Sequence, residues 1–381
     1  MRPLEGIRVL DLTRLLPGPF ATLVLADLGA TVDKVEDPGP GDYTRISPPL
    51  VGDMSTLFHA LNRGKRSAVL NLKSPEGAAA LGRLVRHYDV LIEQFRPGVL
   101  DRLGVGHQAL LEQNPKLIVC ALTGYGQGGP LAKRAGHDLN YLARAGLLGL
   151  QGPTDGPPQL PAFQLADVSG GMWSVIAILA ALREREKTGK GQVLDIAMVD
   201  SVIPFASIGL SRALNGEHWP RGGDWLSGGI APYQCYATKD GQAISLGSLE
   251  PKFLMAFASG VGLELDLGAV LPGPHQAELK EKFVAIFKQK TRAEWEAFAK
   301  SHDCCLEPVL TPEELLTDPQ LVARKVFVES TTPEGKVTQY RTPVTPRDLE
   351  PEPAPRQGEH SQEIFSEAGF SPEEIQTLLG R

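Results

Sequence analysis

The sequence predicts an α/β fold, with a large domain whose parallel sheet is covered by helices on both faces, and a smaller α+β domain. Two observations indicate this. Up to about residue 200, short apolar runs alternate with segments whose apolar residues recur at helical spacing, which is typical of parallel sheets with covered faces. Glycine-rich loops, two further strand-like runs and two helical stretches follow, which indicates a second domain with a different pattern of elements.

The N-terminal segment shows the repeating unit. Residues 7–12 form a short apolar strand, and residues 17–19 (Pro-Gly-Pro) can begin a helix because proline fits the first helical turn. Residues 20–28 carry apolar side chains at helical spacing, Gly29 ends the helix, and residues 31–35 form the returning strand. Right-handed crossovers between such strands make the predicted sheet Rossmann-like in outline.

The same alternation continues along the chain. Ser74 is a predicted helix N-cap, with Pro75 at the first helical position. A long helix over residues 168–186 ends in a cationic segment that suits the negative end of its dipole, and a short helix at about residues 371–379 closes the chain. Further strands are predicted at residues 68–72, 89–92, 117–121 and 193–197.

Composition and motifs exclude several classes of function. The net charge of −7 gives no general support for nucleic-acid binding. No G-x-G-x-x-G follows the first strand and no G-x-x-x-x-G-K-[ST] occurs, so we expect no nicotinamide or P-loop nucleotide site. Four scattered cysteines without a C-x-x-C spacing indicate a reducing compartment and no structural zinc. No apolar run reaches about 18 residues and no signal peptide is recognisable, so we expect a cytoplasmic protein without a membrane span.

A histidine and two carboxylates give the first indication of chemistry. His137 and Asp138 follow Gly136 at a predicted helix start, and Asp167 stands at the start of the next long helix. Each aspartate, taken alone, is explained by N-capping, which satisfies free backbone N–H groups, and a lone histidine after glycine is usually a loop or packing residue. Together they allow another interpretation, in which a histidine and an aspartate pass a proton across one substrate carbon.

Proton removal next to a thioester carbonyl is the chemistry that suits such a pair. The carbon acid is much weaker than any side-chain acid, so the enolate oxygen needs stabilisation, which backbone N–H groups at a helix N-terminus supply without reorganising. The helix dipole also keeps a nearby imidazole neutral and able to act as a base. Two bases on opposite faces of one carbon would invert it.

The residues around this pair resemble the family III CoA-transferase superfamily, and within it the racemase signature of α-methylacyl-CoA racemases. The signature is Gly136-His137-Asp138-x-Asn140-Tyr141. Further motifs that carry the resemblance lie at residues 17–19, 26–30, 62–66, 71–73, 96–100, 123–130, 167–171, 178–182, 250–253 and 358–360. The resemblance therefore extends over the whole chain.

The resemblance implies an interlocked homodimer, in which each chain is threaded through a hole in the other. Each active site is then expected between the large domain of one subunit and the small domain of its partner. Both ends of the chain build the large domain in this arrangement. We therefore expect residues 1–200 to form the first part of a CoA-binding Rossmann-like domain and residues 201–325 the small α+β domain. Residues 326–381 would be a return segment and C-terminal helix that complete the large domain.

The resemblance also implies a role for each catalytic residue. His137 would take or return the proton on one face of the carbon, Asp167 would act on the other face, and Glu250 would orient the histidine. The backbone N–H of Asp138 is expected to polarise the thioester oxygen. In transferase members the position of Asp167 carries the nucleophile and the position of His137 is commonly aromatic, so histidine here favours racemisation. The Glu-Pro setting of Glu250 supports the same choice.

Cationic residues are candidates for binding the phosphates of CoA, although a solvated cationic face would look the same in sequence. These candidates are Arg63, Lys65, Arg66, Lys73, Arg96 and Arg102. Motif matching favours a CoA-binding set that consists of Leu72, Lys73, Phe95, Arg96, Arg102, Gly136 and Tyr141. Within this set, Leu72 and Phe95 are expected to wall the adenine.

Two departures from the racemase pattern bear on substrate identity. Acidic Asp37 stands near the end of the second strand, where racemases carry a basic residue, so one predicted phosphate contact is weakened. Residues 224–229 read Asp-Trp-Leu-Ser-Gly-Gly in place of the racemases' Asn-x-Leu-Asp-Gly-Gly, in the segment expected to face the acyl chain.

The sequence thus predicts an acyl-CoA racemase or epimerase of lipid metabolism. It would invert the α-carbon of 2-methyl-branched acyl-CoA thioesters by 1,1-proton transfer through an enolate, with no metal or redox cofactor and with CoA only as part of the substrate. The leading alternative is a family III CoA-transferase that moves CoA between carboxylic acids through an adduct at Asp167. A non-catalytic CoA-binding or assembly subunit is the third, and the presence of His137, Asp167 and Glu250 argues against it.

Overall fold

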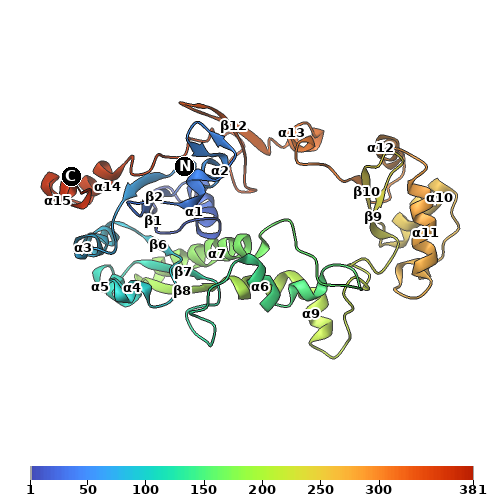
Figure 1. Ribbon diagram of the computed structural model, residues 1–381, viewed down its shortest axis with the longest axis horizontal. Helices are drawn as coiled ribbons and strands as arrows, with labels where there is room; N and C mark the ends of the chain where they lie inside the picture. Colours follow the sequence, from blue (N-terminus) through green and yellow to red (C-terminus); the bar gives the residue numbers. More distant parts are fainter. Residues whose placement is uncertain (1, 381) are drawn as a thin grey trace. The chain divides into compact units, whose positions relative to one another are not determined.

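The computed structural model describes residues 2–380, and the chain divides into two compact units. The first unit holds the residues up to Ala145, Phe163–Pro204 and those from Pro319 onward, and the second holds Gly146–Ala162 and Phe205–Asp318. Both ends of the chain therefore belong to the first unit, as the blue and red ends of the ribbon show in Figure 1.

A parallel sheet of six strands forms the centre of the first unit, in the order β5-β2-β1-β6-β7-β8. Its strands are β1 (Arg8–Asp11), β2 (Thr31–Glu36), β5 (Arg66–Val69), β6 (Val90–Glu93), β7 (Ile118–Thr123) and β8 (Gln192–Ala197). Counted along the chain this order is 3-2-1-4-5-6, the doubly wound arrangement whose winding reverses between β1 and β6. The predicted Rossmann-like sheet is confirmed, and the carboxyl ends of all its strands lie at one edge.

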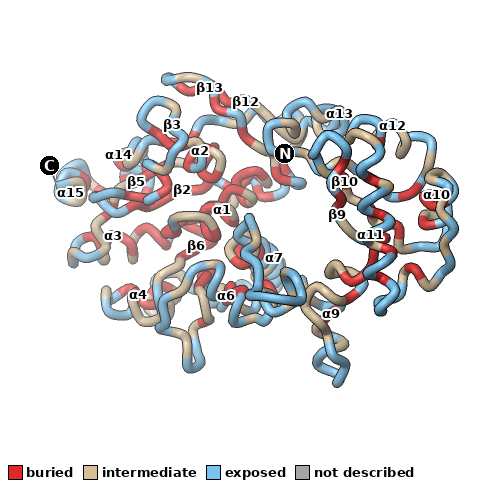
Figure 2. Tube along the Cα trace, turned by 45° about the vertical axis from the view of Figure 1, so that its right-hand side comes forward, coloured by how far each residue is buried: buried red, intermediate tan, exposed pale blue. Residues whose placement is uncertain are grey.

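Two hydrophobic cores lie on opposite faces of this sheet, because side chains alternate along each strand. In β6, Val90 and Ile92 face one core and Leu91 faces the other. Helices α1 (Pro17–Asp27) and α7 (Leu165–Thr188) cover the first face. The second face is covered by α3 (Pro75–Leu84), α5 (His107–Gln113), α14 (Ser361–Glu367) and α15 (Pro372–Leu378). Figure 2 shows the buried residues concentrated along the strands between these helices.

Helix α7 packs closely against its neighbours because two glycines lie on its buried side. A Cβ atom at Gly171 would lie 2.7 Å from the carbonyl oxygen of Pro17, and one at Gly170 would lie 2.8 Å from the side chain of Met198. By length and composition alone, α7 could cross a membrane, which the sequence analysis did not expect. Half of its apolar stretch is buried, and it packs on α1 and β7, as the core helix of a globular domain does.

Shorter elements complete the first unit, and one of them is a hairpin that the sequence analysis did not predict. It pairs β12 (Phe327–Thr332) with β13 (Gly335–Tyr340). The other short elements are β3 (Leu50–Val51), β4 (Met54–Ser55), α2 (Thr56–Asn62), α4 (Val99–Arg102), α6 (Asp138–Arg144), α8 (Met198–Ser201) and α13 (Pro319–Ala323).

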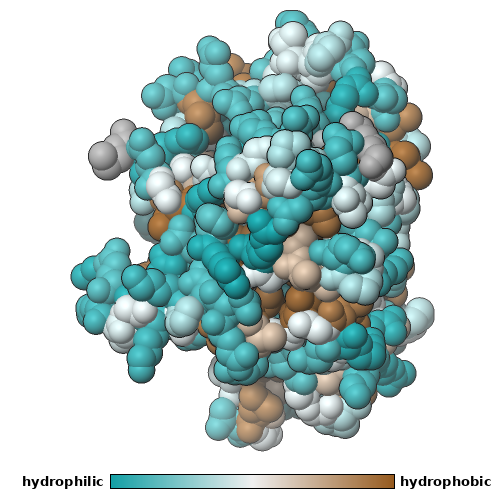
Figure 3. Space-filling view, turned by 90° about the vertical axis from the view of Figure 1, so that its left-hand side faces the viewer, coloured by the Kyte–Doolittle hydropathy of each residue, from teal (hydrophilic) through white to brown (hydrophobic). Residues whose placement is uncertain are grey.

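Hydrophilic side chains cover most of the face drawn in Figure 3, and hydrophobic ones show in smaller areas between them.

The second unit combines helices with a small antiparallel sheet, as expected for an α+β domain. The sheet has the order β11-β10-β9, with β9 (Tyr233–Ala237), β10 (Ala243–Gly247) and β11 (Leu306–Pro308). The helices are α9 (Ser207–Ala213), α10 (Pro251–Val261), α11 (Gln276–Phe287) and α12 (Arg292–Ser301). Aromatic side chains hold the layers together: Tyr236 stacks on Phe287 with ring centroids 4.6 Å apart, and Phe287 contacts Trp295 at 4.8 Å.

Residues 146–162 belong to the second unit, whereas the sequence-based division placed them in the first domain. Contacts distant in sequence explain the difference. The Arg221 Nε–H donates to the carbonyl oxygen of Pro153 at 2.9 Å. A Cβ atom at Gly222 would lie 2.5 Å from the carbonyl oxygen of Gly152, so these two segments approach closely.

Candidate active site

The histidine of the racemase signature is the N-cap residue of α6. The His137 backbone N–H donates to Oδ1 of Asn140 at 3.0 Å, and the Asn140 N–H donates to the His137 carbonyl oxygen at 2.8 Å. This reciprocal pair explains the spacing of His and Asn in the signature. The His137 side chain is exposed. The imidazole is therefore free to contact a substrate.

Two tyrosines hold the segment that precedes His137. The buried Tyr141 hydroxyl donates to the Gly136 carbonyl oxygen at 2.6 Å, and the ring of Tyr125 meets that of Tyr141 edge-on, with centroids 5.1 Å apart. A Cβ atom at Gly136 would lie 2.7 Å from the Tyr141 ring, so glycine is required here for space. Burial raises the pKa of Tyr141 to about 12, which keeps its hydroxyl a donor. Contact of Gly136 and Tyr141 with CoA stays a prediction.

The two aspartates do not cap their own helices, which corrects the N-cap interpretation. Asp138 lies inside the first turn of α6, and its Oδ1 accepts the backbone N–H groups of Ala166 at 2.6 Å and Asp167 at 3.1 Å. Asp138 therefore caps α7 from a different helix. Asp167 lies in the first turn of α7, which begins at Leu165. The sequence could not show this, because the capping partner lies far along the chain.

This arrangement brings two carboxyl groups together and shifts the pKa of both. Burial, together with the charge of Asp138, raises the pKa of Asp167 to about 7. Burial also raises the pKa of Asp138, although the two backbone N–H groups that it accepts oppose the shift. Asp167 is half-buried, and no hydrogen bond or ion pair of its carboxyl group is found in the described part of the chain. A carboxyl group with a pKa near neutrality can serve as either acid or base.

Tyr141 connects this pair with one of the predicted CoA-binding residues. Its hydroxyl feels the charges of Asp167 and Asp138, which raise its pKa, and of Arg96, which lowers it. Arg96 is exposed and follows β6. The structure thus brings Arg96 into electrostatic reach of the segment that carries the histidine and the aspartates.

The other predicted CoA-binding residues follow the carboxyl ends of β5 and β6. Leu72 and Phe95 are half-buried and pack against the same hydrophobic core. Lys73 is exposed and lies 3.7 Å from a carboxylate oxygen of Asp37, the residue whose acidity departs from the racemase pattern. Arg102 is exposed on α4. Ligands of doubly wound sheets bind at this edge, so the placement agrees with a CoA site there.

Three of the cationic candidates are unavailable to CoA, which corrects the prediction for them. Arg63 is buried and donates to Asp27 at 2.7 Å, and buried Lys65 lies 3.3 Å from a carboxylate oxygen of Asp11. Arg66 donates to a buried carboxylate, Asp33, at 2.7 Å and also pairs with α14. The motif at residues 62–66 therefore stabilises the sheet and its neighbouring helices.

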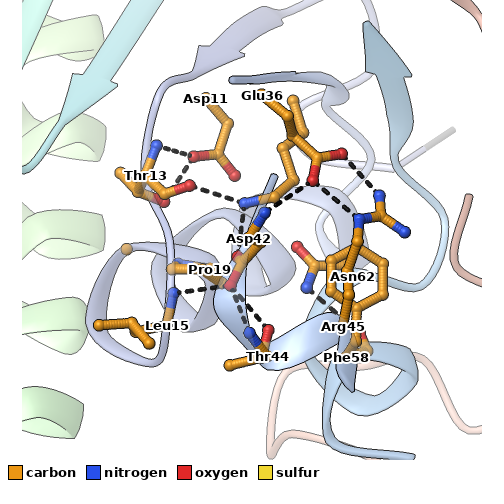
Figure 4. A network of polar contacts seen from close by, with 12 residues as sticks. Asp11, Thr13, Leu15, Pro19, Glu36, Asp42, Thr44, Arg45, Phe58 and Asn62 are labelled. Carbon is orange, nitrogen blue, oxygen red and sulfur yellow. Dashed lines mark hydrogen bonds and ion pairs between the residues drawn. The ribbon is translucent and has the colours of Figure 1, made fainter. Parts of the chain in front are cut away.

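Lys65 belongs to a buried polar network at the ends of β1 and β2. Lys34 lies 3.0 Å from Asp42, and Arg45 donates to Glu36 at 2.6 Å. Figure 4 shows Glu36, Asp42 and Arg45 converging in this network. Burial alone would raise the pKa of Asp11, but the charges of Lys34 and Lys65 outweigh it and lower that pKa to about 2.

A hollow beside α6 is lined in part by two charged residues that were not predicted from the sequence. It has a volume of about 310 Å³ and its charged lining residues are Arg134 and Arg144. The remaining lining residues are Tyr125, Leu131, Ala135, Asn140 and Ala143. The spacing of Asn140 and Arg144 by four residues on α6 was the available sequence signal, since such residues share one helix face.

Glu250 lies in the second unit, where it is the N-cap residue of α10. Its side chain is exposed and makes no capping hydrogen bond, and Pro251 occupies the first helical position. The carboxylate is therefore available to a partner. Orientation of His137 by Glu250 stays a prediction.

The departure at residues 224–229 forms a tight turn. Buried Asp224 pairs with Arg212 at 3.0 Å, and its carbonyl oxygen accepts the Gly229 N–H at 2.7 Å. A Cβ atom at Gly229 would lie 2.2 Å from the carbonyl oxygen of Gly223, so the turn requires glycine. Asp224 thus has a structural role in this chain.

Comparisons with known proteins agree with this geometry. The model of the family described as CoA-transferase family III matches residues 4–361. Alpha-methylacyl-CoA racemase from Homo sapiens is 40% identical over 386 residues, covering 98% of this chain and 96% of the relative. Succinyl-CoA:glutarate CoA-transferase from Mus musculus is 33% identical over 382 residues, covering 96% of this chain and 86% of the relative. The crystal structure of a CAIB/BAIF family protein from Brucella suis matches with a TM-score of 0.84 at 34% identity, covering 96% of this chain and 99% of that chain.

Proposed function

Because the chain belongs to CoA-transferase family III, we propose that this enzyme inverts the α-carbon of 2-methyl-branched acyl-CoA thioesters. The racemase from Homo sapiens shares more identity with it than the transferase from Mus musculus does, 40% against 33%. The signature histidine, at a position that is commonly aromatic in transferases, supports the same choice.

In the proposed mechanism, the α-carbon loses one proton and gains another. His137 takes the α-proton from one face, and the electron pair of the broken C–H bond moves into the thioester carbonyl to give an enolate. The backbone N–H of Asp138 stabilises the developing oxyanion. Asp167, protonated, then delivers a proton to the opposite face, and the roles reverse for the other enantiomer.

The observation that carries this proposal is the linkage of His137 and Asp167 through Asp138. Asp138 follows the histidine directly, and its carboxylate holds the backbone N–H of Asp167 at 3.1 Å. The start of α6 therefore connects the proposed base for one face of the α-carbon with the proposed acid for the opposite face. The His137 side chain is exposed, and within the described residues the Asp167 carboxyl group makes no hydrogen bond, which suits proton transfer to a substrate.

The remaining expectations complete the proposal. Glu250 orients His137 across an interlocked homodimer, and CoA is bound as part of the substrate at Leu72, Lys73, Phe95, Arg96 and Arg102. The reaction uses no metal or redox cofactor, and the enzyme works in the cytoplasm in lipid metabolism.

CoA transfer between carboxylic acids is the second candidate, because transferases are also similar to the chain and residues 224–229 depart from the racemase pattern. In this reaction the Asp167 carboxylate attacks the thioester carbonyl, CoA leaves as the thiolate, and a mixed anhydride forms. The thiolate then attacks the Asp167 carbonyl and releases the first carboxylic acid. The acceptor acid finally takes CoA through the reverse steps.

Isotope exchange in deuterated water separates these candidates. The racemase proposal expects each enantiomer of a 2-methylacyl-CoA to lose its α-hydrogen signal by NMR and to become a mixture of both enantiomers. No exchange and no inversion would refute it. Trapping of an Asp167 adduct by hydroxylamine, together with CoA transfer to a free acid, would establish the transferase. Absence of CoA binding would refute both and leave the non-catalytic assembly role.

A further inference from the structure

Glu250 is exposed, but the turn that precedes it, residues 247–249, is held by several hydrogen bonds within the second unit. Glu250 stands at the end of this turn as the N-cap of α10, and its backbone carbonyl oxygen accepts the N–H groups of Phe253 and Leu254 at 3.0 and 3.1 Å, as the carbonyl of an N-cap residue does. The side chain of an N-cap residue commonly accepts a first-turn N–H as well, but the Glu250 side chain makes no capping hydrogen bond. The Glu250 carboxylate is thus held in place only through its backbone.

Ser248 fixes that backbone from inside the second unit. Its side chain is completely buried, and its hydroxyl donates to the Cys304 carbonyl oxygen at 2.5 Å. Its backbone N–H donates to the Pro232 carbonyl oxygen at 2.9 Å. Ile244 and Leu246 are the buried residues of β10, and alternation along the strand places Ser248 on the same inward side. A serine therefore stands where the pattern calls for an apolar residue.

The residue after Cys304 accepts a second hydrogen bond from this turn. The Gly247 N–H donates to the Cys305 carbonyl oxygen at 2.9 Å. Cys305 has a φ of 52°, in the left-handed region that residues other than glycine rarely adopt. Two consecutive carbonyl groups, of Cys304 and Cys305, thus accept hydrogen bonds from the same turn. Burial, together with the charge of Glu250, also raises the pKa of the Cys305 thiol.

We propose that Ser248 is a positioning residue, whose buried hydroxyl holds the Glu250 carboxylate at the orientation that the reaction needs. This inference rests on the proposed role of Glu250 in catalysis. It predicts that removal of the Ser248 hydroxyl acts on turnover through Glu250 and leaves the substrate affinity unchanged.

The test is a double-mutant cycle between Ser248→Ala and Glu250→Gln, read as the kcat of α-proton exchange. Alone, Ser248→Ala should lower kcat about tenfold and leave KM within about twofold, because small misplacements of a catalytic group cost mainly the chemical step. In the Glu250→Gln background, Ser248→Ala should cost less than about twofold more. Equal losses in both backgrounds, or no loss alone, would overturn the proposal.

Ser245→Ala is the matched control. The Ser245 hydroxyl on the same strand also donates to a β11 carbonyl, that of Glu307, at 3.0 Å, but it does not lead to Glu250. This variant should keep kcat within about twofold of the unmodified enzyme. A loss as large as that of Ser248→Ala would show a general weakening of the sheet and overturn the proposal.

Amide hydrogen exchange separates failure of the positioning from failure of the proposed function. Ser248→Ala should raise the exchange rate at Leu249 and Phe253, whose N–H groups bond Gly247 and Glu250, about tenfold because the turn loses an anchor, and Ser245→Ala should not. If these amides are unchanged, Ser248 does not hold the turn and the inference is wrong. If they respond but the unmodified enzyme exchanges no α-proton, the proposed reaction is wrong and Ser248 holds the turn without a catalytic role.

Discussion

Two polar clusters of the first unit differ in how their charges are matched. Where β1 and β2 end, Lys34 lies 3.0 Å from Asp42 and Lys65 lies 3.3 Å from Asp11, all four side chains fully buried. Where α6 and α7 begin, the carboxyl group of Asp167 is only half-buried, and within the described residues nothing pairs with it.

The pKa values follow this difference in pairing. The charges of Lys34 and Lys65 overcome burial and lower the pKa of Asp11 to about 2, so it stays ionised. Burial and the charge of Asp138 raise the pKa of Asp167 to about 7, so it can exchange a proton at neutral pH. Paired charges stabilise the fold, whereas the unpaired carboxyl group is suited to chemistry.

The largest expected effect is on the unpaired side. Asp167→Asn should lower the rate of inversion by about 10²–10⁴-fold, the usual contribution of a general acid or base, because the amide cannot deliver a proton. The melting temperature should stay the same or rise, since no hydrogen bond to this carboxyl group is lost among the described residues. Optical rotation of a 2-methylacyl-CoA and circular dichroism measure the two quantities. Retained inversion would exclude Asp167 as the acid.

The paired cluster should respond in the opposite way. Asp11→Asn removes the partner of buried Lys65 and should lower the free energy of unfolding by about 3–5 kcal/mol, because a buried charge is left uncompensated. Inversion per folded molecule should hardly change. Urea unfolding provides the measurement. A stability loss below about 1 kcal/mol would show that the network is not needed for the fold.

Gly136→Ala tests how tightly the catalytic segment is packed. The added Cβ would lie 2.7 Å from the Tyr141 ring, so we expect a loss of about 1–3 kcal/mol in the free energy of unfolding, as for other overpacked sites. Gly128→Ala is the control, because no heavy atom lies within 4 Å of a Cβ there. Equal denaturation midpoints for the two variants would contradict the tight packing at Gly136.

Arg96 and Arg66 extend the comparison of unpaired and paired charges to the predicted CoA site. Exposed Arg96→Ala should weaken CoA binding about tenfold with no change in melting temperature, because an ionic hydrogen bond to phosphate is lost. Arg66→Ala should instead lower the melting temperature and leave CoA affinity unchanged, because Arg66 pairs with Asp33. Isothermal titration calorimetry and thermal unfolding decide the matter. The reverse pattern would restore Arg66 as a phosphate partner.

A change of pH is the mildest perturbation. For the enantiomer whose α-proton faces Asp167, kcat/KM should rise up to about tenfold per pH unit below the Asp167 pKa of about 7, because the base must be ionised. For the other enantiomer it should fall above that pH, because Asp167 must be protonated. Rate profiles from pH 5 to 9 test this. Profiles that show no limb near pH 7 for either enantiomer would contradict the raised pKa.

The sheet could be predicted from the sequence because its signals are local. Apolar runs such as residues 117–121, bounded by helical patterns, correspond to β7, and proline at the start of α1 and α3 marks where these helices begin. The β12–β13 hairpin was missed, because its strands alternate exposed polar residues with few apolar ones.

The site could be predicted in part. The signature identified His137 and a separate motif identified Asp167, but the partner of Asp138 is the start of α7, which only the fold brings close. In the same way, nothing local distinguishes Arg66, which is paired across strands with Asp33, from the exposed Arg96. Pairing over long sequence distances decides which charges are structural.

The most direct test of the account is α-proton exchange of each separate enantiomer in deuterated water, with His137→Ala and Asp167→Asn compared. If His137 and Asp167 face opposite sides of the carbon, each variant should exchange only the enantiomer whose proton faces its remaining base, and neither should invert it. The two variants should therefore be active on opposite enantiomers. Exchange of the same enantiomer by both variants, or inversion by either, would contradict the account.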